Sequence, residues 1–95
     1  MKKYIYILRD KKLGAYDNPI LRVDDVEHVV ESYVRALKVC SPEEAVRARD
    51  MTLNYFGTFD DVTGKFDLLD HEEKLLDFED YIPRKEEAKD GGQSN

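Results

Sequence analysis

The sequence predicts a small α+β protein in which an antiparallel sheet, in the order β-α-β-β, is covered by one main amphipathic helix. Alternation of apolar and aromatic residues predicts strands at 3–9, 51–59 and 65–69. An apolar stripe at helical period predicts a helix over 26–37. Residues 60–64 have the composition of a tight turn, which predicts a hairpin between the last two strands.

The chain of 95 residues is long enough for one domain, expected over 1–82, with a flexible acidic and polar tail at 83–95 that has little to bury. The lone Cys40 cannot form a disulfide within the chain, which favours a reducing compartment. No apolar run approaches the roughly 20 residues of a membrane helix, so no membrane partner is expected. Arg9 and Asp10 also end the first apolar run too early for a signal peptide.

The main helix is predicted from its apolar stripe of Val26, Val29, Val30, Tyr33, Val34 and Leu37. Asp24 and Glu27 form a capping-box pattern, so we expect Asp24 to be the N-cap. A short second helix is expected to begin after Ser41, with Pro42 at its first position and Glu44 completing a second capping box.

The end of the domain is predicted to be helical. Asp70 and Glu73 repeat the capping-box spacing. Apolar residues follow at Leu75, Leu76, Phe78 and Ile82. We therefore expect the return strand to end at Leu69 and a C-terminal helix to follow.

The sequence contains no recognisable catalytic constellation. His28 and His71 lack a second His or Cys at ligand spacing, and both are expected in exposed first turns of helices. The acidic cluster does not match a calcium loop and is explained by turn formation; its members are Asp60, Asp61, Asp67 and Asp70. We expect no catalytic residue, metal or cofactor, and a protein that acts by binding rather than as an enzyme.

Charge is distributed unevenly along the chain. Residues 1–23 carry six basic and two acidic side chains, a net of +4; since the whole chain is −6, residues 24–95 carry −10. The basic segment has two interpretations: it protects an edge strand from pairing with other chains, or it forms a local phosphate-binding face.

Aromatic residues fall on the predicted strands, at Tyr4, Tyr6, Tyr55, Phe56, Phe59 and Phe66. They can form the core, a stacking platform for single-stranded nucleic acid, or a protein-binding surface. Tyr16, in a loop, is expected to be exposed. If one face of so small a sheet stays open, its aromatic residues would favour a homodimer.

Several short segments carry a family resemblance. Residues 56–64 read Phe-Gly-Thr-Phe-Asp-Asp-Val-Thr-Gly, residues 7–12 read Ile-Leu-Arg-Asp-Lys-Lys, and Pro19-Ile20 follows Tyr16. Residues 41–44 read Ser-Pro-Glu-Glu. Together they resemble the small non-structural protein of gokushoviruses, the single-stranded DNA bacteriophages of the Microviridae. The resemblance covers about residues 3 to 69, and it departs from the family at Glu44-Ala45, where Asp-Tyr is usual.

The resemblance implies an accessory protein of the host-cell cytoplasm, absent from the virion, that assists single-stranded genome synthesis or packaging by binding single-stranded DNA. The residues expected to bind DNA are Lys2, Lys3, Arg9, Lys11, Lys12, Tyr16 and Arg22. The alternative is an acidic adaptor that binds a phage or host protein without DNA contact. The residues expected to contact that protein are Glu72, Glu73 and Asp77.

Overall fold

The computed structural model describes residues 1–83 and confirms an α+β protein with an antiparallel sheet. The elements, in chain order, are β1 (Lys2–Asp10), β2 (Ala15–Tyr16), β3 (Ile20–Arg22), α1 (Val26–Lys38), α2 (Pro42–Ala48), β4 (Met51–Asp60), β5 (Lys65–Asp77) and the 3-10 helix η1 (Phe78–Tyr81). The expected β-α-β-β order is therefore incomplete, because two short strands precede α1. Apart from Pro83, the expected tail lies outside the described residues.

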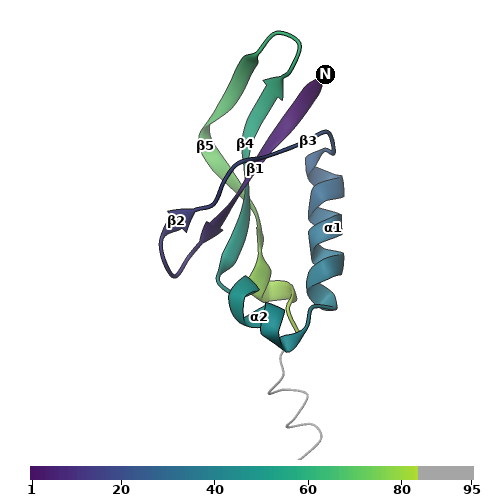
Figure 1. The fold of residues 1–95 in the computed structure, drawn as a ribbon, viewed down its shortest axis with the longest axis vertical. Coiled ribbons are helices and arrows are strands. Elements are labelled where there is room, and N and C mark those ends of the chain that lie inside the picture. Colours follow the sequence, from purple (N-terminus) through teal and green to yellow (C-terminus); the bar gives the residue numbers. More distant parts are fainter. Residues whose placement is uncertain (84–95) are drawn as a thin grey trace, which may run out of the picture.

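The sheet is arranged around β1. Strand β4 pairs with β1 along its whole length, while β2 and β3 pair with different parts of its other edge. Strand β5 pairs with β4 and forms the far edge of the sheet (Figure 1). All of these pairings are antiparallel. Because β1 is paired along both of its edges, the basic N-terminal strand is central and not at an edge of the sheet.

The core lies between the sheet and the two α-helices. Tyr6 of β1 and Leu53 of β4 are 1% and 0% exposed, and they share one apolar cluster with Val29 of α1 and Ala45 of α2. Burial raises the pKa of Tyr6 to about 12. Half-buried Cys40 packs against the same cluster. No helix in the described part of the chain is long and apolar enough to span a membrane.

The second surface of the sheet faces away from this core. Because side chains alternate along a strand, the neighbours of Tyr6 and Leu8 point to the opposite side. Ile5 is buried there without joining the core cluster, and Leu21 of β3 lies opposite it. We call this surface the open face; α1 and α2 pack on the other side of the sheet, with the core cluster.

The predicted N-cap of α1 is wrong by one residue. The carboxylate of Asp25, not Asp24, accepts a hydrogen bond from the backbone N–H of His28 at 3.1 Å. The carboxylate of Asp24 instead forms an ion pair with Arg22. The backbone carbonyl of Asp24 accepts a hydrogen bond from the hydroxyl of Tyr6. The predicted capping box of α2, between Ser41 and Glu44, is confirmed.

The predicted C-terminal helix is also wrong. Strand β5 continues from Lys65 to Asp77, and only the single turn η1 follows it. Glu73 pairs with Tyr55, and Leu76 is buried opposite Leu53. A short isolated helix would be marginal in water, whereas the strand gains a hydrogen-bonded partner and burial. His71 consequently lies in β5 and not in a first helical turn.

A bulge at Gly57 decides which side chains reach the open face. Gly57 has a φ of +135° and lies opposite Ile5, while Tyr55 lies opposite Tyr6, so Phe56 is an extra residue in β4. Phe56 contacts Tyr16, and Phe59 lies opposite Lys3 of β1. The bulge therefore places two phenylalanines three positions apart on the same surface. Residues 69–72 of β5 lie across from Phe56 alone.

Replacing Gly57 by alanine tests this bulge. A Cβ there would lie 2.3 Å from the carbonyl oxygen of Asp67 and 2.8 Å from the Cα of Leu68. We expect Gly57→Ala to lower the free energy of unfolding by about 2–4 kcal/mol, measured by urea denaturation. Gly64→Ala is the control, because its φ is also positive but nothing lies within 4 Å; it should cost about 1–2 kcal/mol. Equal losses would contradict a role for the clash.

The corrected cap predicts a pH dependence. The carboxylate of Asp25 lies 2.6 Å from Nδ1 of His28, and this hydrogen bond raises the pKa of His28. The contact between Asp25 and His28 therefore stabilises the folded state fully below the pKa of His28 in the unfolded chain, about 6.5. This stabilisation is lost as pH rises through the higher pKa of His28 in the folded protein. In an NMR titration of the His28 ring, Asp25→Asn should lower its pKa and the control Asp24→Asn should not. If Asp25→Asn left the pKa of His28 unchanged, the contact between Asp25 and His28 would be contradicted.

Candidate nucleic-acid interface

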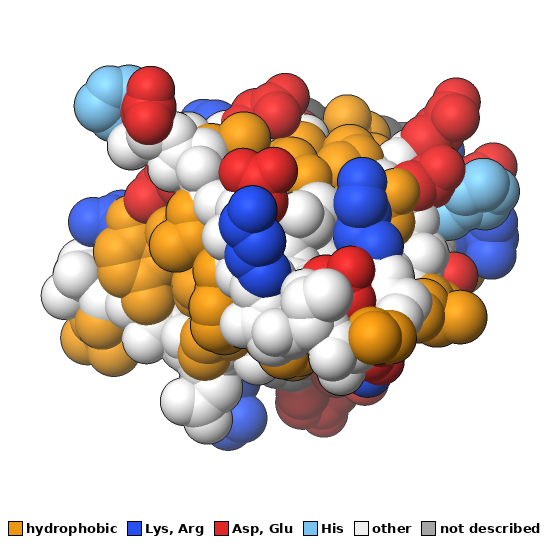
Figure 2. Space-filling model, turned by 90° about the horizontal axis from the view of Figure 1, so that it is seen from above, with side chains coloured by type: hydrophobic (Ala, Val, Ile, Leu, Met, Phe, Trp, Pro, Cys, Tyr) orange, Lys and Arg blue, Asp and Glu red, His pale blue; other side chains and the backbone are white. Residues whose placement is uncertain are grey.

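The predicted basic residues do not form one continuous surface. Lys3 lies 3.5 Å from Asp61, and Arg22 lies 2.8 Å from Asp24. Lys2 points to the opposite side of β1 from Lys3. Figure 2, a view from the end that carries the N-terminus, shows basic, acidic and hydrophobic side chains interspersed on the surface. Net charge along the sequence therefore does not translate into a single basic patch.

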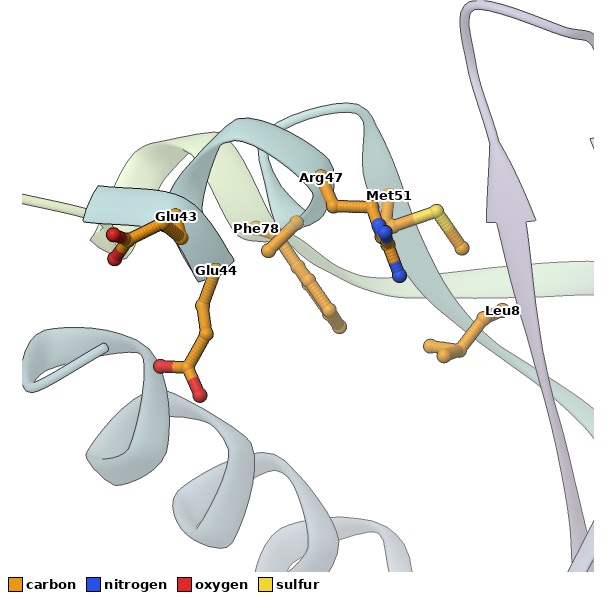
Figure 3. Close-up of a pocket in the computed structure, with 7 residues that line it drawn as sticks. Leu8, Glu43, Glu44, Arg47, Met51 and Phe78 are labelled. Atoms are coloured by element: carbon orange, nitrogen blue, oxygen red, sulfur yellow. The ribbon is translucent and has the colours of Figure 1, made fainter. Parts of the chain in front are cut away.

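Hollows lie on both sides of the sheet. The apolar hollow, of about 520 Å³, lies on the helix side beside α2 (Figure 3). The open-face hollow, of about 400 Å³, has three basic residues in its lining. Its lining residues are Arg9, Lys11, Tyr16, Thr52, Asn54, Glu72 and Lys74. A smaller hollow, of about 280 Å³, includes only Lys2 of the residues predicted to bind nucleic acid. The open-face hollow brings three of them together, which makes it the candidate site.

Aromatic contacts organise one wall of the open-face hollow. The guanidinium carbon of Arg9 lies 5.5 Å from the ring centroid of Tyr16, a cation–π distance. The ring of Tyr16 meets Phe56 edge-on, with centroids 5.9 Å apart. The Tyr16 hydroxyl donates to Glu72, and this hydrogen bond raises the pKa of Tyr16. The open face therefore holds Tyr16 as a neutral aromatic donor near pH 7.

A second aromatic pair lies further along the same face. Phe59 and Phe66 are opposite each other in β4 and β5, with ring centroids 4.7 Å apart. Phe66 is 58% exposed, and Lys3 lies opposite Phe59. Leu68, also exposed, lies opposite Gly57 between the two aromatic pairs. The face thus carries aromatic side chains at two positions, each with a basic neighbour.

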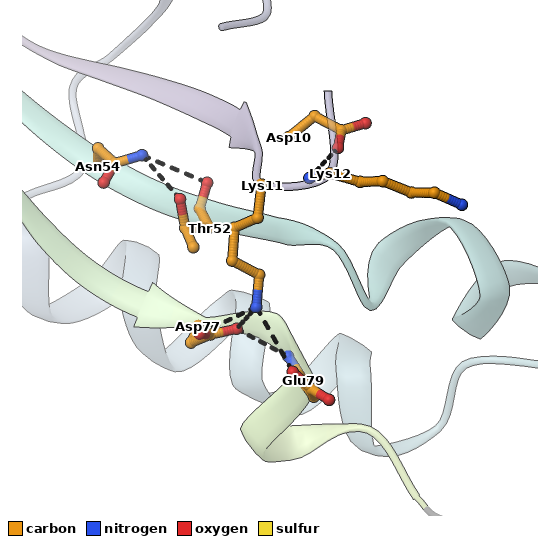
Figure 4. Close-up of polar contacts among 7 residues, drawn as sticks. All are labelled: Asp10, Lys11, Lys12, Thr52, Asn54, Asp77 and Glu79. Carbon is orange, nitrogen blue, oxygen red and sulfur yellow. Dashed lines mark hydrogen bonds and ion pairs between the residues drawn. The ribbon is translucent and has the colours of Figure 1, made fainter. Parts of the chain in front are cut away.

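The floor of the open-face hollow is polar and rigid. Asn54 is 2% exposed, and its Nδ2 donates to the carbonyl oxygen of Ile7 at 3.1 Å. The same Nδ2 donates to Oγ1 of Thr52, also at 3.1 Å (Figure 4). A carbonyl oxygen can only accept, so this contact fixes the orientation of the Asn54 amide. Thr52 is also buried. The hollow therefore has a hydrogen-bonded floor beneath its charged side chains.

One basic residue of the hollow is held by acids. Nζ of Lys11 lies 2.8 Å from Asp77 and 3.5 Å from Glu79, and the hydrogen bond that it donates to Asp77 is the main cause of the raised pKa of Lys11. Figure 4 shows Lys12 pointing away from this group. Lys11 therefore enters the site as part of an ion pair, while Lys12 is outside it.

Three of the seven predicted residues, Arg9, Lys11 and Tyr16, are brought together in the open-face hollow. Lys2, Lys3, Lys12 and Arg22 lie outside it. Lys74 and Asn54 were missed. Lys74 had been assigned to a helix, and Asn54 carried no signal beyond its place in a strand. Phe56 was among the aromatic residues considered for stacking, and the glycine that follows it is the signal for the bulge that places it on the open face, because glycine inside a strand often marks a bulge.

The acidic residues of the adaptor hypothesis are separated in the same way. Glu72 binds Tyr16 on the open face, and Asp77 binds Lys11. Glu73 lies opposite Tyr55, which belongs to the helix side. No group of three or more His, Cys, Asp or Glu residues within 1–83 is arranged to hold a metal ion.

Comparison with known proteins adds no relative to this description. No model of a protein family matches the chain. No curated protein and no solved structure gives a significant match either.

The hydrogen bond between Tyr16 and Glu72 can be tested by titration. Glu72→Gln removes the carboxylate that raises the pKa of Tyr16, so we expect that pKa to fall toward its ordinary value of about 10. NMR of 13Cζ-labelled tyrosine between about pH 8 and pH 12 would measure it. Glu73→Gln is the matched control and should leave Tyr16 unchanged. An unaltered pKa in Glu72→Gln would show that the two side chains are apart in solution.

Proposed function

We propose that this chain is a non-structural accessory protein of a single-stranded DNA phage, and that it binds single-stranded DNA on the open face rather than catalysing a reaction. It would act in the cytoplasm of the bacterial host, outside the virion, in genome synthesis or packaging. The observation that carries the binding proposal is the combination, on one surface, of basic residues and two aromatic pairs that each include one exposed ring, Tyr16 or Phe66. The phage assignment rests on the sequence resemblance.

The geometry of the open face suits unpaired bases. Proteins that bind single strands without strong sequence preference stack bases on aromatic rings along a basic groove. Tyr16 with Phe56 and Phe59 with Phe66 offer two such positions. Phe56 and Phe59 are three residues apart, about 10 Å at the rise of a strand. Arg9, Lys74 and Lys3 lie beside these rings, and a phosphate can reach Lys3 by replacing its ion-pair partner Asp61.

The acids near the site moderate the affinity without preventing binding. A solvent-exposed ion pair such as Lys11 with Asp77 contributes about 1 kcal/mol or less, so a phosphate can replace the carboxylate at small cost. The net charge of −6 opposes association with DNA at long range. We therefore expect weak binding that falls steeply as salt rises.

Fluorescence anisotropy of a labelled single-stranded oligonucleotide at low salt tests the proposal. Phe66→Ala should weaken binding by about tenfold through lost stacking. Lys74→Gln should also weaken it and should reduce the slope of log affinity against log salt by about 0.7. Phe66 and Lys74 are exposed, so both variants should fold, which circular dichroism checks.

Lys2→Gln is the matched control, because it removes the same charge on the other side of the sheet. It should have a smaller effect than Lys74→Gln. Absent binding at low salt, or equal losses in both variants, would overturn the assignment of DNA to the open face.

A further inference from the structure

The apolar hollow beside α2 is not used by the proposed function. Its floor is formed by Leu8, Ala48, Met51 and Phe78, and Arg47 lies at its mouth (Figure 3). Glu43 and Glu44, from the first turn of α2, also line it and are called here its acidic rim; the carboxylate of Glu44 in addition accepts the backbone N–H of Ser41. Apolar side chains exposed in a cavity of this size are typical of a binding site, and an acidic rim favours an occupant with a basic neighbour.

The chain itself presents such an occupant. The turn between β1 and β2 carries Leu13, which is 75% exposed, directly after Lys12. The carboxylate of Asp10 accepts hydrogen bonds from the backbone N–H groups of both residues, at 2.9 and 3.0 Å, which gives the turn a fixed shape. Within residues 1–83 the side chain of Lys12 makes no ion pair. The turn thus offers an apolar side chain next to a cation.

We infer that two copies of this chain dimerise by inserting Leu13 of each copy into the apolar hollow of the other. Lys12 then meets the acidic rim at Glu43 and Glu44 of the partner copy. Asp10 carries the charge opposite to that of Arg47 at the mouth of the hollow. The contact pairs an apolar side chain with an apolar floor and opposite charges at its edge.

The position of the turn allows two copies to form a closed, symmetric dimer in which the same contact is made twice. The backbone N–H of Lys11 donates to the carbonyl oxygen of Asp50 at 2.7 Å, and Asp50 lies between α2 and Met51. Leu8, in the floor, is in the strand that leads into the turn. Turn and hollow therefore belong to the same end of the molecule, so a two-fold axis can satisfy both at once and end the assembly at two copies.

Size-exclusion chromatography with light scattering on the full chain, over a range of protein concentrations, tests the inference. We expect the wild-type mass to rise from one chain to two as concentration increases. Leu13→Ser, in an exposed turn, should weaken dimerisation by roughly tenfold or more. Val62→Ser is the matched control: Val62 is 80% exposed in the turn between β4 and β5, and its loss should leave the dimer unchanged.

A charge exchange makes the test specific to this interface. Lys12→Glu and Glu43→Lys should each weaken the dimer, and the double variant should restore it, since the opposite charges meet again. Three outcomes would overturn the inference: a monomer at every concentration, a dimer that Leu13→Ser leaves intact, or charge variants whose effects simply add. An intact dimer in Leu13→Ser would place the contact elsewhere, and the open face would be examined next by Leu68→Ser.

Discussion

The close approach of β4 to β5 at Gly57 is the constraint on which the arrangement of the open face depends. A side chain at this position would overlap the backbone of β5, and the positive φ adds a second reason for glycine. The extra residue at the bulge reverses the alternation of β4, so Phe56 and Phe59 point the same way. Without that reversal the strand would divide its aromatic residues between the core and solvent. One backbone conformation thus places both aromatic pairs on a single surface.

Local signals in the sequence were sufficient for most of the fold. The stripe of α1, the capping box of α2 and the turn at residues 60–64 each depend on residues close together in the chain, and all three are present. The prediction of a C-terminal helix is wrong because the apolar spacing of this segment also suits a strand. The segment pairs with β4, which is distant in sequence, and this pairing decides for the strand. The predicted N-cap of α1 is wrong by one residue because the adjacent Asp24 and Asp25 are equally able to cap a helix. Asp24 is instead engaged by Arg22, two residues before it, and by the hydroxyl of Tyr6, eighteen residues before it.

The candidate site was less accessible to prediction than the fold. Arg9 and Tyr16 could be selected as a cation and an exposed aromatic, but their stacking requires the pairing of β1 with β2. The acids that bind Lys11 lie more than sixty residues away in sequence. The distribution of charge along the sequence does not reveal any of these pairings. The site is therefore defined by sheet register, which a single sequence specifies only weakly.

The irregular middle of β5 has a consequence for association between copies of the chain. This strand forms the edge of the sheet, and an edge invites other chains to add to it. The excursion at residues 69–72, opposite Phe56 alone, breaks the straight row of backbone groups that a growing fibril would need as a template. Acidic side chains within the excursion add repulsion between neighbouring copies. The chain thus leaves an aromatic surface uncovered while making its outer strand a poor seed for amyloid.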